Sequence, residues 1–225
     1  MGVRTTARLL RCGVAAGPLF LTTALVAGAT RADYRPLRHP VSSLALGPGG
    51  WVQVTNFLVA SVLCGAAAVG LARARPAGSI RVEPVLVGAA AVGLLGSGVF
   101  LTDPVSGYPL GTPDLLTEHS STGALLHDLF ALPTFLGLPA AALVNAWASR
   151  RAGEPGWVGY SAASGLAGLA GIVVTSAAFA QAPALVAFGG LLQRLTVAVD
   201  LGWLTAVSLR ALAATRATPA EVPVR

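Results

Sequence analysis

The stretch VLVGAAAVGLLGSGVFLT, residues 85–102, contains no charged residue and decides the fold. A helix of this length spans about 27 Å at about 1.5 Å per residue, close to the ~30 Å hydrocarbon core of a bilayer. Five more long apolar segments lie on either side of it, at residues 12–30, 51–72, 119–148, 158–180 and 185–209. Only continuous helices or closed barrels satisfy their backbone groups inside a bilayer. The sequence therefore predicts an all-α integral membrane bundle of six transmembrane helices.

Charge is scarce along the whole chain. Charged residues make up 11% of the 225 residues, against about 25% in soluble domains. The spans and their loops use almost all of the chain, so we expect one transmembrane domain over residues 1–212 and a flexible cytoplasmic tail over 213–225. The third and fifth spans are rich in glycine and alanine, which favours close approach between helices.

The distribution of arginine predicts the orientation. All 15 basic residues are arginine; eleven lie in segments that are cytoplasmic if the N-terminus is inside, three in the first external loop and one in a span. Cytoplasmic loops carry the positive excess, so both termini are predicted to be cytoplasmic. The arginines mark the ends of spans and form no basic helical face for nucleic acid, so a rim that contacts anionic lipid is the better interpretation.

The first span has two interpretations. Arg4, Arg8 and Arg11 precede it, and Ala27-Gly28-Ala29 resembles a cleavage site, so the segment fits a secretory signal. A signal anchor has the same pattern, and five further spans follow. We therefore expect this span to remain in the protein.

The first two external loops resemble each other. Residues 39–47 read HPVSSLALG and residues 103–111 read DPVSGYPLG. Each copy follows an outward span and precedes an inward one, as duplication of a helical hairpin would produce. Chance similarity of common residues is the alternative. If the two loops are copies, they should form similar turns near each other, with His39 and Asp103 both extended because each precedes a proline.

The first of these loops also carries a family resemblance. Residues 34–44, YRPLRHPVSSL, followed by Gly47-Pro48 and Trp51, resemble the signature of the bacterial multi-pass family catalogued as domain of unknown function 998. His39 stands where that family usually has aspartate, which weakens a metal or acid role for this position. Residues 119–128 and 192–194 also resemble the family, so the resemblance covers residues 15–210. It implies a six-helix bundle in the cytoplasmic membrane and brings no established activity.

Ionisable side chains inside spans are candidates for function because each costs about 2.5–3.5 kcal/mol to insert. Asp128, Arg194 and Asp200 qualify, and His127 is a borderline fourth. Asp128 and Arg194 each lie nine residues inside the predicted outer end of their spans. Opposite charges at matched depth should pair, so the sequence predicts that these two face each other with His127 and Gln193 nearby. Such a pair is either structural or part of a functional site.

The leading functional hypothesis is that the protein binds or moves a small anionic or lipid-like ligand through an outward-facing polar site near Asp128 and Arg194. The external arginines could hold phosphate headgroups of membrane lipids, or they could simply pair with acids of neighbouring loops. The predicted ligand-binding residues are Arg35, Arg38, His39, Ser42, Asp103, His119, His127, Asp128, Gln193 and Arg194. Membrane lipids, including those with anionic headgroups, are the expected partners.

Two alternatives remain open. The chain could be a structural or accessory membrane subunit without its own activity. It could also be a membrane-embedded metal-dependent hydrolase, since His39, His119 and His127 are predicted near one membrane face. His119 and His127 are eight residues apart, about 12 Å along a helix, which is too far for one zinc ion with bonds of about 2.1 Å unless the helix starts after His119. We therefore expect no metal, no cofactor and no catalytic residue.

Overall fold

The computed structural model describes residues 2–75, 81–115 and 120–217. Each of its six long helices is long and apolar enough to cross a membrane, which confirms the predicted all-α bundle. The helices are α1 (Val3–Thr30), α2 (Trp51–Ala74), α3 (Val82–Val99), α4 (Thr122–Arg151), α5 (Pro155–Phe179) and α6 (Gly189–Ala217). Two short 3₁₀ helices, η1 (Val41–Ala45) and η2 (Val186–Phe188), lie in the connections before α2 and α6.

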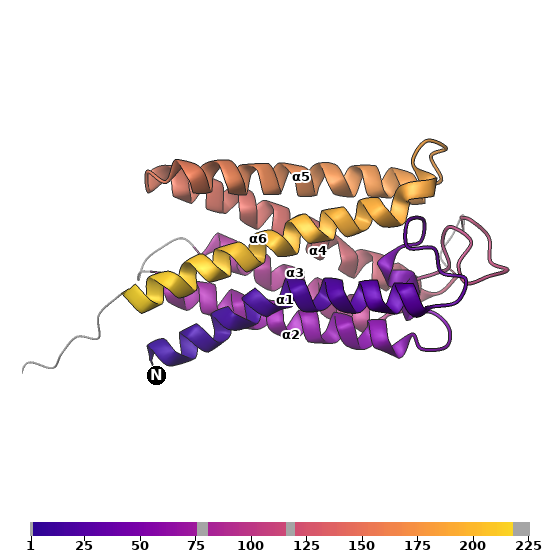
Figure 1. Cartoon of the computed structure of the whole chain (residues 1–225), viewed down its shortest axis with the longest axis horizontal. Coiled ribbons are helices and arrows are strands. Elements are labelled where there is room, and N and C mark those ends of the chain that lie inside the picture. The colour runs from indigo at the N-terminus through magenta and orange to yellow at the C-terminus, as the bar shows by residue number, and fades with distance from the viewer. Residues whose placement is uncertain (1, 76–80, 116–119, 218–225) are drawn as a thin grey trace, which may run out of the picture.

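The helices run up and down and form a closed ring (Figure 1). Each helix packs against its neighbours in sequence, and α6 returns to pack against α1. We call the end of the bundle that holds the start of α1 and the end of α6 the terminal end. The opposite end, which holds the α1–α2, α3–α4 and α5–α6 connections, is called the loop end. The predicted orientation places the loop end outside the cell.

Close packing of α3 on α4 depends on glycine. A Cβ atom added at Gly96 would overlap the ring of Phe130, and one at Gly93 would meet the backbone oxygen of the same residue. On the other side of the ring, Gly171 of α5 makes room for Thr196 of α6. The predicted role of small residues in helix approach is confirmed at these positions.

The helix bounds differ from the predicted spans mainly at the ends. Helix α1 begins at Val3, so the arginines before the first apolar segment are helical. Helix α4 begins at Thr122 rather than 119, because the Ser121 hydroxyl caps it by accepting a hydrogen bond from the Ala124 amide at 3.1 Å. Helix α6 continues to Ala217, so residues 213–217, which the sequence placed in the tail, are helical. The remainder of the predicted tail lies outside the described residues.

The two similar loops lie beside each other but have different turns. Arg38 donates from Nε to the Ser106 carbonyl at 3.1 Å, and the His39 and Tyr108 ring centroids are 5.1 Å apart. Pro40 leads into the η1 helix, whereas Ser106 and Gly107 both have positive φ in a tight turn. The prediction of similar turns is therefore wrong. Glycine at 107 tolerates a left-handed conformation that the serine at the matching position 43 would strain.

Candidate functional site

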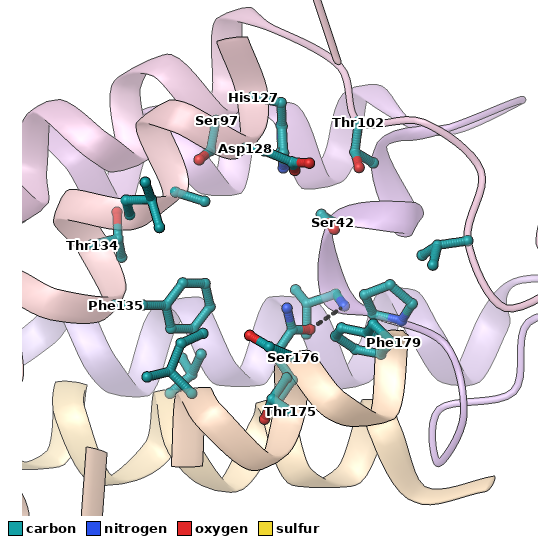
Figure 2. A pocket seen from close by; sticks show the side chains of 18 of the residues that line it. Ser42, Ser97, Thr102, His127, Asp128, Thr134, Phe135, Thr175, Ser176 and Phe179 are labelled. Carbon is teal, nitrogen blue, oxygen red and sulfur yellow. Dashed lines mark hydrogen bonds between the residues drawn. The ribbon is translucent and has the colours of Figure 1, made fainter. Parts of the chain in front are cut away.

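A cavity of about 520 Å³ opens within the loop-end half of the ring (Figure 2). Side chains of α3, α4, α5 and α6 form most of its wall. Phe20 of α1, Phe57 of α2, the start of η1 and the α3–α4 connection also contribute to it. Most of the wall is apolar, with Phe135 and Phe179 prominent among the rings that face it. The polar side chains of the lining are Ser42, Ser97, Thr102, Asp103, His127, Asp128, Thr134, Thr175, Ser176, Gln193 and Asp200.

The structure brings half of the predicted site residues into this lining. They are Ser42, Asp103, His127, Asp128 and Gln193. They come from four separate parts of the chain, which only the closed ring brings together. His119, another predicted site residue, lies outside the described residues.

Three of these lining residues also hold the local structure together. His127 is buried, and its Nδ1 lies 2.8 Å from the Phe100 carbonyl at the end of α3. The Gln193 side-chain oxygen accepts a hydrogen bond from the Val41 amide at 2.7 Å, which ties η1 to α6. Asp103 accepts hydrogen bonds from the amide and hydroxyl of Ser120, just before α4. The mouth of the cavity is therefore fixed by hydrogen bonds between elements distant in sequence.

Two further predicted residues, His39 of the α1–α2 connection and Arg194 of α6, form together with Tyr34 a group that we call the loop clasp. Arg194 of α6 donates from Nη1 to the carbonyls of Pro36 at 2.6 Å and His39 at 3.1 Å, and from Nη2 to the Tyr34 hydroxyl at 2.5 Å. The Tyr34 hydroxyl in turn lies 2.9 Å from the Pro40 carbonyl. The clasp fastens the α1–α2 connection onto the start of α6.

The predicted ion pair between Asp128 and Arg194 is not formed among the described residues. Asp128 lines the cavity, whereas the Arg194 guanidinium is directed to the loop clasp. The depth estimate treated the α1–α2 connection as lying above the bundle. That connection instead folds down onto α6, and its carbonyl oxygens, together with the Tyr34 hydroxyl, supply the acceptors that a carboxylate was expected to provide.

Burial sets the ionisation of the two rings in the clasp. It lowers the pKa of His39 to about 4, with help from the positive charges of Arg38 and Arg35. The Nδ1 of His39 accepts a hydrogen bond from the Arg35 amide at 2.9 Å, as a neutral imidazole can. Burial also raises the pKa of Tyr34, although Arg194 opposes that shift. Both rings are therefore neutral at physiological pH.

The external arginines are largely occupied by loop partners. Arg38 forms an ion pair with Asp114 at 2.7 Å as well as its bond to the loop carbonyl. Arg31 donates to the carbonyls of Leu46 at 2.8 Å and Leu44 at 3.1 Å. Arg35 has an exposed side chain. Two of the three external arginines therefore stabilise the loops.

Sequence reasoning left two lining residues out of the site. Asp200 of α6 is only 4% exposed, and its buried Oδ2 has no hydrogen-bond partner in the described part of the chain. Thr175 of α5 is 2% exposed, and its hydroxyl likewise has no partner there. As an acid in the middle of a span, Asp200 is a functional candidate by position alone. It lies deeper along α6 than Arg194 does, so the matched-depth argument did not bring it into the predicted site.

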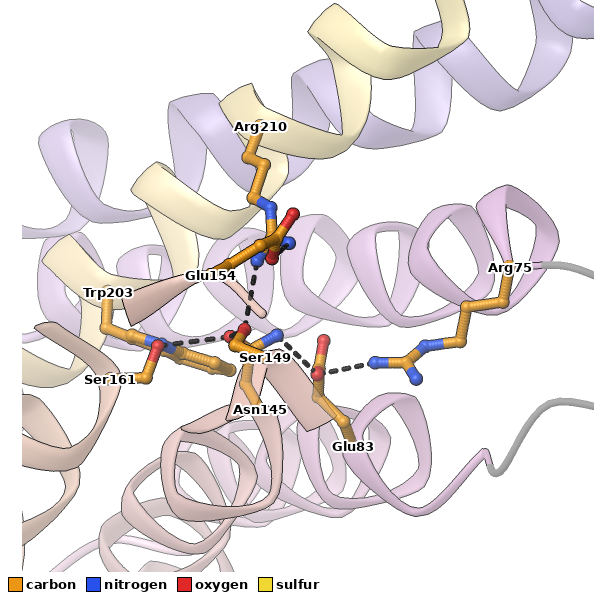
Figure 3. A network of polar contacts seen from close by, with 8 residues as sticks. All are labelled: Arg75, Glu83, Asn145, Ser149, Glu154, Ser161, Trp203 and Arg210. Carbon is orange, nitrogen blue, oxygen red and sulfur yellow. Dashed lines mark hydrogen bonds and ion pairs between the residues drawn. The ribbon is translucent and has the colours of Figure 1, made fainter. Parts of the chain in front are cut away.

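A second polar group, the terminal-end network, lies on the other side of the cavity floor (Figure 3). Glu83 of α3 is 1% exposed and accepts from Arg75 Nη2 at 2.5 Å and from Asn145 Nδ2 at 2.8 Å. Ser161 of α5 links Asn145 to the fully buried indole of Trp203. The network also includes Ser149 and the ion pair between Arg210 and Glu154. It joins side chains on or beside five of the six helices. The search for ionisable residues inside spans did not include Glu83, because Glu83 precedes the predicted third span.

A metal centre finds no support in the described part of the chain. Across residues 2–75, 81–115 and 120–217, no three His, Cys, Asp or Glu side chains lie close enough to hold a metal ion.

Six membrane-crossing helices in a closed ring define a multi-pass helical membrane protein. Residues 14–210 match the family described as Protein of unknown function (DUF998), and the chain belongs to that family. The resemblance carried by residues 34–44 is thereby confirmed. No curated protein and no solved structure matches the chain.

Proposed function

We propose that this protein binds a small, lipid-like molecule in the cavity, entering from the loop end. The observation that carries the proposal is the cavity itself. Its volume of about 520 Å³ lies within the range of about 300–1,000 Å³ that is usual for ligand pockets. Its wall is largely apolar with a few polar groups, as such pockets generally are.

Of the two ligand classes that the sequence predicted, the lining supports the lipid-like one over the anionic one. The charged side chains of the described lining are Asp103, Asp128 and Asp200. An anion would meet like charge there. The nearest predicted cation, Arg194, donates its hydrogen bonds to the loop clasp.

The packing at the terminal end supports entry of the ligand from the loop end only. Below the floor residues Leu138 and Leu201, the bundle is filled by the buried Trp203 and the terminal-end network. We place the loop end outside the cytoplasmic membrane of a bacterium. The arginines that cluster near the terminal end support this orientation.

Binding can be tested with phenylbutanol, a small amphipathic probe that fits the volume of the cavity. We expect saturable binding of radiolabelled phenylbutanol to the full chain in nanodiscs. Ala131→Trp places a large ring in the cavity wall and should abolish it. Val92→Trp, on a 53% exposed position of α3, adds the same ring outside and should leave it unchanged.

Failure to bind would favour the accessory-subunit alternative. If wild type shows no saturable binding, or if Ala131→Trp and Val92→Trp behave alike, the cavity is not a binding site. The neutral probe is chosen so that this result does not depend on any charged residue of the lining.

A further inference from the structure

The cavity floor contains a buried carboxylate, that of Asp200. Asp200 is 4% exposed, and its Oδ2 is buried without a hydrogen-bond partner among the described residues. Buried polar atoms in folded proteins are nearly always paired, and each exception calls for an explanation. The residue that carries it, Asp200, lines a cavity large enough to hold a ligand.

The depth of Asp200 in the membrane makes an unpaired carboxylate there energetically unfavourable. Asp200 lies eleven residues after Gly189, the first residue of α6. At about 1.5 Å per residue it lies roughly 16 Å along the helix, near the middle of a ~30 Å hydrocarbon core. Acids at this depth are usually paired or face a substrate pathway.

The surrounding helix leaves space for the carboxylate. A Cβ atom added at Gly168 of α5 would overlap Oδ1 of Asp200. Gly168 therefore lets α5 pack closely against the Asp200 carboxylate, and it has no side chain that could donate a hydrogen bond to it. Two turns further toward the loop end on α5, Thr175 also lines the cavity, and its buried hydroxyl has no hydrogen-bond partner in the described part of the chain.

The same protein gives a buried carboxylate charged and polar partners elsewhere. Glu83 Oε2 accepts hydrogen bonds from Arg75 and Asn145. Among the described residues Asp200 receives nothing comparable, although Arg194 lies on the same helix and donates its hydrogen bonds to the loop clasp instead. The missing partner of Asp200 is therefore best supplied from the cavity.

We propose that Asp200 is the counter-ion for a protonated amine, so that the ligand of the cavity is a small apolar amine. This inference rests on the proposed function and names its ligand class. The ammonium N–H groups would donate to the Asp200 carboxylate, and the apolar body would lie against Phe135, Leu138 and Val197, which share the lining. Asp103 and Asp128, also in the lining, add negative potential that attracts a cation inward.

The test compares three probes with one skeleton: phenylbutylamine, phenylbutanol and phenylbutanoate. Binding to the full chain in nanodiscs of zwitterionic lipid is measured by equilibrium dialysis at pH 7. For wild type we expect the amine to bind roughly tenfold more tightly than the alcohol, as a charge-assisted hydrogen bond would give. The carboxylate should bind more weakly than the alcohol.

Asp200→Asn removes the charge and keeps the shape. It should reduce amine affinity to that of the alcohol and leave alcohol affinity unchanged. The matched control is Asp33→Asn, which removes one exposed carboxylate at the loop end without touching the cavity, and it should keep the preference for the amine.

The outcomes separate the two proposals. Equal affinity of wild type for amine and alcohol, or an amine preference that survives in Asp200→Asn, overturns the role of Asp200 and leaves the cavity as a binding site. Absence of saturable binding for all three probes overturns both proposals. If the variant does not fold, equal affinity of wild type for the amine and the alcohol still overturns the role of Asp200.

Discussion

The two ends of this bundle treat a buried acid in opposite ways. At the terminal end, Glu83 is enclosed by a guanidinium and an amide from neighbouring elements. Toward the loop end, Asp200 is almost as deeply buried and faces a cavity, with one oxygen lacking a partner in the described chain. The fold thus has the means to satisfy a buried carboxylate and uses them at one end only. The difference distinguishes a structural contact from a candidate binding site.

The largest effect should be the difference in cysteine labelling between the two ends of the bundle, because they are predicted to lie on opposite sides of the membrane. Cysteine at Leu110, which is 78% exposed at the loop end, should react with an impermeant maleimide in intact cells. Cysteine at the exposed Ala152, at the terminal end, should react only after lysis. Both variants need a background in which Cys12 and Cys64 are replaced. Reaction of Ala152→Cys from outside would invert the orientation and with it the proposed direction of ligand entry.

The terminal-end network should be the stronger contributor to stability. Glu83→Gln leaves Arg75 beside a neutral group and should lower the free energy of unfolding by about 3 kcal/mol. Glu154→Gln also breaks an ion pair, but its side chain is 41% exposed, so the loss should be under about 1 kcal/mol. Thermal unfolding in mild detergent measures both. Equal losses would mean that Glu83 is not held as the structure describes.

The loop clasp should weaken in acid. His39 titrates near 6.5 when unfolded and at about 4 when folded, so the unfolded chain takes up the proton first. Stability contributed by neutral His39 is therefore present above pH 6.5 and is lost as pH falls toward 4, by about 2 kcal/mol between pH 7 and pH 5. Thermal unfolding of wild type and His39→Gln at both pH values tests this. A slope that is unchanged in the variant would contradict it.

The smallest effect on stability should come from Asp200→Asn, and its sign should be opposite to that of Glu83→Gln. Asp200→Asn removes a buried carboxylate whose Oδ2 has no partner in the described part of the chain. It should therefore leave the free energy of unfolding unchanged or raise it by about 1 kcal/mol at most. Glu83→Gln, the matched change at the other end, should lower it. A marked loss of stability in Asp200→Asn would show that the carboxylate is structural.

The six spans could be predicted because hydropathy and helix length are local properties. The composition of residues 85–102 alone predicts a membrane helix, whatever the rest of the chain contains. The helix ends were less certain, since α4 starts where Ser121 caps it and α6 continues past the last apolar run. Capping and continued packing depend on neighbours that hydropathy does not record.

The partners of charged residues could not be predicted in the same way. Equal depth suggested that Arg194 pairs with Asp128, but its acceptors are backbone carbonyls and one phenol of a loop about 155 residues earlier. Backbone acceptors leave no trace in residue types. Asp200 and Glu83 were visible as acids, yet their different roles depend on which groups the ring places beside them.

The clasp between α6 and the α1–α2 connection also has a consequence for the order of synthesis. The connection leaves the ribosome first, but the Arg194 guanidinium and the Gln193 amide that bind it arrive with the last helix. Until then the carbonyls of Pro36 and His39 and the Val41 amide lack their final partners. A chain that stalls after α5 therefore displays an unfastened loop. A protease or chaperone on that side of the membrane could recognise this loop as the mark of an unfinished ring.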